Sequence, residues 1–148
     1  MSSRGRRLLW HGMLLFGLGL LTGLVSQNFT NPRMGLSAHL EGIMNGTFLL
    51  AAGAAWKHVR LSERAASVAF GALLYGTYAN WLTTTAAAVL GTAAMTPLAS
   101  GAHKGVAWQE AVVATGFVSV ALAMIVSSAL LLLGFRGAAS GAGDSERT

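Results

Sequence analysis

The sequence predicts an all-α integral membrane protein, a bundle of four transmembrane helices. Three observations lead to this prediction: 53% of the 148 residues are apolar, only 10% are charged, and the mean hydropathy is +0.57. Soluble domains usually carry about 25% charged residues. A chain this short and this apolar is expected to form one membrane-embedded domain.

Four segments are apolar for long enough to cross a bilayer, whose hydrocarbon core of about 30 Å needs roughly 20 helical residues. The predicted helices cover about 8–26, 36–56, 65–91 and 106–135, within one domain at 8–135. Pro32 and Pro97 fall between them, where a missing N–H group interrupts no helix. Residues 1–7 form a short N-terminal segment, and the small polar residues of 136–148 are expected to be a disordered tail.

The basic residues predict how the helices are oriented. One side of the predicted membrane carries seven of them: Arg4, Arg6, Arg7, Lys57, Arg60, Arg64 and Arg136. The opposite side has only Arg33 and Lys104 outside the helices. The positive-inside rule therefore predicts a multi-pass protein of the inner (cytoplasmic) membrane with both termini in the cytoplasm. The chain has no cysteine, which excludes disulfides, thiolate metal sites and thiol nucleophiles.

Polar groups within the predicted spans are costly and usually functional. His39, Glu41 and Asn45 lie in the second span, and Asn80 lies in the third. Helical spacing places Glu41 and Asn45 on one stripe, because they are four residues apart. In the antiparallel third span, Thr83 and Thr84 lie at the depth of Asn45, and Asn80, on the same polar stripe, lies about one turn further in. We therefore expect both amides to face one cavity.

His39 lies on a different stripe, which it shares with Gly42 and Gly46. A neutral imidazole is a good iron ligand, and two glycines would leave a bare surface for a flat macrocycle. The same G-x-x-x-G spacing is also typical of close helix packing. A buried Asn45 is likewise compatible with a hydrogen bond between helices. The residues alone leave these alternatives open.

Three stretches resemble a known family of small membrane proteins, the hydroxylaminobenzene mutases of nitroaromatic degradation. They are "WHGMLLF" at 10–16, "NPRMGLSAHLEGIMNGTFLL" at 31–50 and "YANW" at 78–81. The chain is more distantly similar to styrene oxide isomerase, a trimeric four-helix membrane protein with a b-type haem between neighbouring subunits. The pattern shared with that enzyme is a histidine followed six residues later by Asn-Gly, here His39, Asn45 and Gly46.

The resemblance implies an isomerase that rearranges hydroxylaminobenzene-type aryl hydroxylamines to ortho-aminophenols, with ferric haem b as a Lewis acid. It implies a homotrimer in the lipid bilayer with haem between subunits, a small aromatic hydroxylamine as substrate and no nucleic-acid partner. His39 becomes the axial ligand of the iron. The resemblance also makes Asn45 and Asn80 the catalytic residues. Beside the resemblance, the glycine stripe makes Gly42 and Gly46 candidates for contact with the haem, and Arg33, on the same outer side as His39, is a candidate for binding it. Glu41 is a third catalytic candidate, as a group that could handle protons.

Two other functions remain as alternatives. The first is an epoxide isomerase of the styrene oxide isomerase kind. That enzyme has a catalytic tyrosine four residues after the asparagine that matches Asn80, whereas this chain has Thr84 there, which disfavours an epoxide substrate. The second is a non-catalytic small membrane protein. A small multidrug-type exporter would need a glutamate in its first helix, and residues 8–26 contain none.

Overall fold

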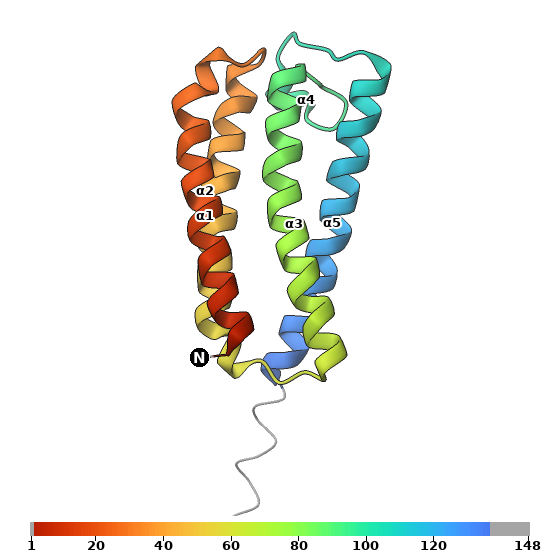
Figure 1. The fold of residues 1–148 in the computed structure, drawn as a ribbon. Coiled ribbons are helices and arrows are strands. Elements are labelled where there is room, and N and C mark those ends of the chain that lie inside the picture. Colours follow the sequence, from red (N-terminus) through yellow and green to blue (C-terminus); the bar gives the residue numbers. More distant parts are fainter. Residues whose placement is uncertain (1, 137–148) are drawn as a thin grey trace, which may run out of the picture.

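Four long helices run alongside one another in the computed structural model, which describes residues 2–136 (Figure 1). They are α1 (Ser3–Val25), α2 (Pro32–Ala55), α3 (Glu63–Leu90) and α5 (Ala107–Arg136). The short helix α4 (Pro97–Ser100) lies in the α3–α5 connection. No strand occurs within residues 2–136. The all-α prediction is therefore confirmed, while the tail predicted beyond Arg136 lies outside the described residues.

The helices form two hairpins that meet through α2 and α3. Helix α1 packs most extensively on α2, and α3 packs most extensively on α5 (Figure 1). The contact between α2 and α3 joins the two hairpins. Hydrogen bonds hold the connecting segments against the ends of the helices. Asn31, for example, donates from its amide to the carbonyl oxygens of Ala99 and Ser100, at 3.0 and 3.3 Å.

The first three helices begin earlier than hydropathy predicts because polar side chains cap them. The Ser2 hydroxyl accepts a hydrogen bond from the Gly5 N–H group at 3.1 Å, so α1 begins at Ser3 rather than near residue 8. The Asn31 side chain accepts from the Met34 N–H group at 3.1 Å, and Pro32 follows as the first residue of α2. A capped helix can therefore begin in residues that are too polar for a hydropathy-based prediction to include.

Glycines bring the backbones of α1 and α2 into direct contact. A Cβ atom on Gly19 would lie only 2.6 Å from the backbone nitrogen of Ile43, and one on Gly46 would lie 2.5 Å from that of Phe16. Gly42 faces the Cα atom of Gly19 in the same way. Small residues at such positions permit close helix approach.

This contact corrects one prediction. Gly42 and Gly46 do not leave an open surface for a macrocycle, because the backbone of α1 covers both of them. The open surface on which their predicted contact with the cofactor rested is therefore absent. The G-x-x-x-G spacing had two interpretations, and the structure supports the one in which it permits close helix packing.

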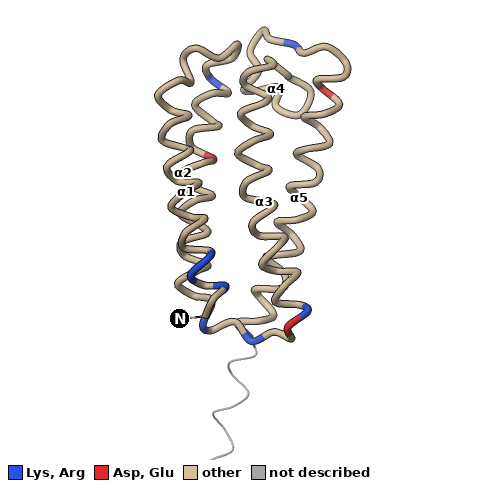
Figure 2. The backbone as a smooth tube through the Cα atoms, viewed as in Figure 1, with Lys and Arg blue, Asp and Glu red and all other residues tan. Residues whose placement is uncertain are grey.

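Two helical segments are long and apolar enough to cross a membrane: Ser3–Asn28 and Ala107–Arg136. Large apolar side chains on both are exposed, with Leu24 at 79% and Ile125 at 66%. Helices α2 and α3 are of similar length, with 24 and 28 residues, but carry more polar side chains. Most of the Lys and Arg positions lie at the end of the bundle that carries the N-terminus (Figure 2).

At that end, Arg4 donates a hydrogen bond to Glu63 at 2.9 Å and ties the start of α1 to the start of α3. The Arg4 guanidinium holds the pKa of the Glu63 carboxyl below its usual value, by this hydrogen bond and by its charge. Both groups are accessible to solvent, so the pair contributes little to stability.

We expect Gly19→Ala to destabilise the protein by about 1–3 kcal/mol, because the added methyl group has no room against α2. Thermal unfolding of the detergent-purified protein, followed by far-UV circular dichroism, should show a lower midpoint. Gly17→Ala is the matched control, since a Cβ atom on Gly17 would meet nothing within 4 Å. Equal midpoints for the two variants would contradict the close contact.

Candidate functional site

Glu41 joins the two asparagines that the sequence singled out. Its Oε2 atom accepts a hydrogen bond from the Asn45 amide at 3.0 Å and another from the Asn80 amide. Asn45 is 8% exposed, and Asn80 is half-buried. The two hydrogen bonds fix both amides and link α2 to α3, which brings Asn45 and Asn80 together as predicted.

His39 bonds to the other neighbour of α2. Its Nδ1 atom lies 2.8 Å from the carbonyl oxygen of Gly19. Because a carbonyl oxygen only accepts, Nδ1 carries the proton and donates it, and Nε2 keeps a free lone pair. Gly23 makes this geometry possible, since a Cβ atom there would lie 2.5 Å from Nδ1.

A groove runs beside the imidazole of His39. Its volume is about 430 Å³, and its walls are mostly apolar side chains of α1 and α2, among them Leu20, Leu21, Leu24 and Leu36. All four leucines are exposed, at 47%, 60%, 79% and 52%. The imidazole of His39 thus lines a groove that is open at the surface of the chain.

His39 and the Glu41 cluster (Glu41, Asn45 and Asn80) lie on different flanks of α2. At 3.6 residues per turn, about 120° separates His39 from Asn45 and about 160° separates it from Glu41. His39 bonds to α1, whereas the cluster bonds to α3. One chain does not bring the imidazole and the two amides to a common point.

The "YANW" stretch at 78–81 links α3 to both of the preceding helices. The Tyr78 hydroxyl lies 3.1 Å from His11 Nδ1 and 3.3 Å from the His11 carbonyl oxygen. Trp81 donates from Nε1 to the Thr22 hydroxyl at 3.0 Å, and Asn80 bonds to Glu41. Three of its four side chains therefore position helices relative to one another.

The remaining predicted residues lie outside these contacts. Arg33 is exposed on the first turn of α2 and makes no side-chain hydrogen bond or ion pair with other described residues. Thr84 is buried one turn after Asn80 on α3. Sequence reasoning missed Gly19, Gly23 and Thr22 of α1. The signal that would have indicated α1 as the partner of α2 is the seven-residue spacing of Gly5, Gly12 and Gly19.

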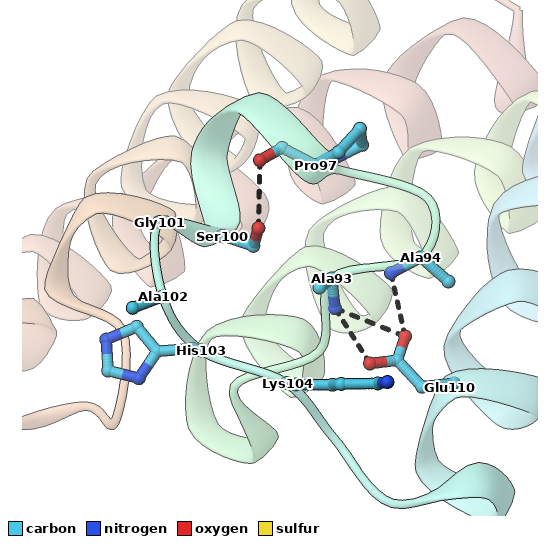
Figure 3. A pocket seen from close by; sticks show the side chains of 9 residues that line it. All are labelled: Ala93, Ala94, Pro97, Ser100, Gly101, Ala102, His103, Lys104 and Glu110. Atoms are coloured by element: carbon cyan, nitrogen blue, oxygen red, sulfur yellow. Dashed lines mark hydrogen bonds between the residues drawn. The ribbon is translucent and has the colours of Figure 1, made fainter.

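A second pocket of about 510 Å³ lies in the α3–α5 connection, away from these residues (Figure 3). The Glu110 carboxylate accepts hydrogen bonds from the backbone N–H groups of Ala93, Ala94 and Gly105, each with a contact of 2.9 Å. His103 and Lys104 also line this pocket. Glu110 thus holds the connection in place, and no site residue predicted from the sequence lies there.

Comparison with known proteins matches almost the whole described chain to one family. Residues 4–136 match the family described as "Styrene oxide isomerase". Hydroxylaminobenzene mutase HabB of Ectopseudomonas oleovorans is 50% identical over 134 residues, which are 90% of this chain and 82% of that protein. Hydroxylaminobenzene mutase HabA of the same organism is 41% identical over 124 residues, 83% of this chain and 92% of that protein. No solved structure matches the chain. The resemblance predicted from the sequence is confirmed.

We expect Gly23→Ala to push the His39 imidazole away from Gly19, because the added methyl group would lie only 2.5 Å from Nδ1. ¹⁵N NMR of labelled histidines should show His39 protonated at Nδ1. Gly23→Ala should shift both ring nitrogens, and Gly17→Ala should leave them unchanged. A wild-type His39 protonated at Nε2 would contradict the hydrogen bond to Gly19.

Proposed function

Because the chain belongs to the styrene oxide isomerase family and its relatives are hydroxylaminobenzene mutases, it is an isomerase, and we propose that it rearranges aryl hydroxylamines to ortho-aminophenols. The observation that carries this proposal is the 50% identity with a hydroxylaminobenzene mutase over 90% of this chain. That coverage includes most of the helical region in which His39 and the Glu41 cluster lie.

The proposed reaction neither gains nor loses electrons overall. The N–O bond of the hydroxylamine breaks, and a C–O bond forms at the ortho carbon of the ring. The ortho hydrogen leaves as a proton, and the nitrogen gains one. The difficult step builds negative charge on the leaving oxygen and positive charge on nitrogen and ring. Fixed dipoles near those atoms lower the barrier. Asn45 and Asn80 supply such dipoles, and Glu41 holds them in place.

Ferric haem b is the cofactor that we propose, and His39 is the residue that would bind its iron. Two features fit this group. The Nε2 lone pair is free because Nδ1 donates to Gly19, which is the usual arrangement of a metal-bound histidine. The adjoining groove is apolar and open. Arg33 lies on the same end of α2 and is the residue that we propose for the haem propionates. When bound, ferric haem supplies a Lewis acid for the leaving oxygen.

We further propose that the working site lies between copies of the chain, in a homotrimer. His39 and the Glu41 cluster face different flanks of α2, so a second copy must supply the amides that meet the substrate held near His39. Heterologous contacts of this kind close into a ring when the rotation between copies permits. The exposed leucines beside His39 are available to such a contact.

In the proposed membrane arrangement all four long helices cross the inner membrane, with both termini in the cytoplasm. Helices α2 and α3 can lie in the bilayer because hydrogen bonds within the Glu41 cluster satisfy its carboxylate and amide groups. The uneven distribution of basic residues supports the orientation (Figure 2). Aromatic hydroxylamines partition into bilayers, so a site at membrane depth suits the substrate.

Epoxide isomerisation is the second candidate, favoured by the family description that matches residues 4–136. Thr84 occupies the position at which the epoxide isomerase has its catalytic tyrosine, which favours the hydroxylamine. Assays of one preparation with hydroxylaminobenzene and with styrene oxide separate the two functions. Preferred turnover of styrene oxide would overturn the first proposal.

We expect His39→Ala to lose the Soret band and to lower turnover of hydroxylaminobenzene at least about 100-fold, because no other ligand replaces the imidazole. Absorption spectra and chromatography of 2-aminophenol measure the two effects in haem-supplemented preparations. His58→Ala, at an exposed histidine, is the matched control and should retain both. An active His39→Ala protein with full haem content would show that another residue binds the iron.

We expect single cysteines to report the proposed orientation without background, because the chain has no cysteine of its own. In intact cells an impermeant maleimide should label Lys104→Cys and not Lys57→Cys. After the membrane is permeabilised, both should react. Labelling of Lys57→Cys alone in intact cells would mean the opposite orientation, and equal labelling of both would mean that α3 does not cross.

A further inference from the structure

Glu41 fixes the direction in which two amides point. Each asparagine amide has an N–H end and a carbonyl end, and both N–H ends face the same carboxylate oxygen. Both carbonyl oxygens therefore point away from Glu41, since a carboxylate repels them. Neither Asn45 Oδ1 nor Asn80 Oδ1 accepts a hydrogen bond from another described residue. The cluster thus presents two amide oxygens as acceptors that remain available to a ligand.

We propose that Glu41 is a positioning residue that selects the substrate class. By holding the N–H ends of Asn45 and Asn80, it makes the site an acceptor of hydrogen bonds and so favours ligands that carry N–H and O–H donors. This inference rests on the proposed function, because it assumes that the Glu41 cluster faces the substrate.

The two candidate substrates differ in this property. An aryl hydroxylamine carries one N–H and one O–H donor beside the ring. An epoxide carries only an acceptor oxygen, which two amide oxygens would repel. A site built to pair with polar groups of its substrate discriminates strongly against an analogue that leaves those groups unpaired. Glu41 therefore favours the hydroxylamine through the two asparagines, without touching it.

The same orientation suits the charge that the proposed reaction develops. When the N–O bond breaks, nitrogen and ring become positive. The negative ends of two carbonyl dipoles then face the substrate, with the carboxylate behind them. Turning either amide around would direct N–H groups at the positive charge. The orientation set by Glu41 is thus expected to affect both binding and rate.

Glu41→Gln tests the inference because the new side chain has almost the same shape but can also donate. A donating amide at position 41 can pair with an asparagine oxygen and turn that amide around. The experiment measures the Michaelis constant of hydroxylaminobenzene and the inhibition constant of styrene oxide in the same assay, on haem-loaded protein. Glu63→Gln is the matched control, at a glutamate 86% exposed.

We expect Glu41→Gln to weaken the preference for hydroxylaminobenzene over styrene oxide about tenfold, with haem content unchanged. Glu63→Gln should keep the wild-type ratio. An unchanged ratio in Glu41→Gln overturns the inference, even if both constants change together, because a structural role alone would affect both ligands alike. If Glu41→Gln does not fold, Asn80→Ala replaces it and should weaken hydroxylaminobenzene alone. A wild-type protein that turns over no hydroxylamine overturns the proposed function and this inference with it.

Discussion

The backbone contact between α1 and α2 is the constraint on which the rest of the structure depends. Glycines on both helices leave no side chain between them, so the rotation of α2 about its axis is fixed by direct contact with α1. That rotation decides which neighbour each polar residue meets. His39 reaches a carbonyl group of α1, whereas Glu41 and Asn45 face α3. A small turn of α2 would break both arrangements.

His39, Glu41 and Trp81 are compatible with apolar surroundings because each meets a partner from another helix. The Nδ1 proton of His39 is donated to Gly19, Glu41 accepts from two amides, and Trp81 donates to Thr22. Unpaired, each of these groups would be costly in apolar surroundings. Paired, they hold an imidazole and two amides in fixed orientations. The proposed catalysis uses that order, because oriented dipoles need no rearrangement as charge develops.

Much of the fold was predictable from the sequence, but less of the site. Runs of apolar residues predicted the four long helices, and depth predicted that Asn45 and Asn80 would meet. Periodicity shows which residues share a face of one helix, but it does not show which neighbour covers that face. For this reason Gly42 and Gly46 appeared open although α1 covers them, and the hydrogen bond from Asn80 to Glu41 could not be predicted. The hydrogen-bond acceptor of His39 could not be predicted either, because every residue has a backbone carbonyl group and the sequence does not show which one lies near the imidazole.

The proposed working site combines His39 from one copy with the Glu41 cluster from another. Co-expression of His39→Ala and Asn45→Ala, each inactive alone, tests it most directly. Random mixing should restore about a quarter of the wild-type turnover of hydroxylaminobenzene, since about one contact in four then combines an intact His39 with an intact Asn45. Turnover no higher than that of either variant alone would contradict a shared site.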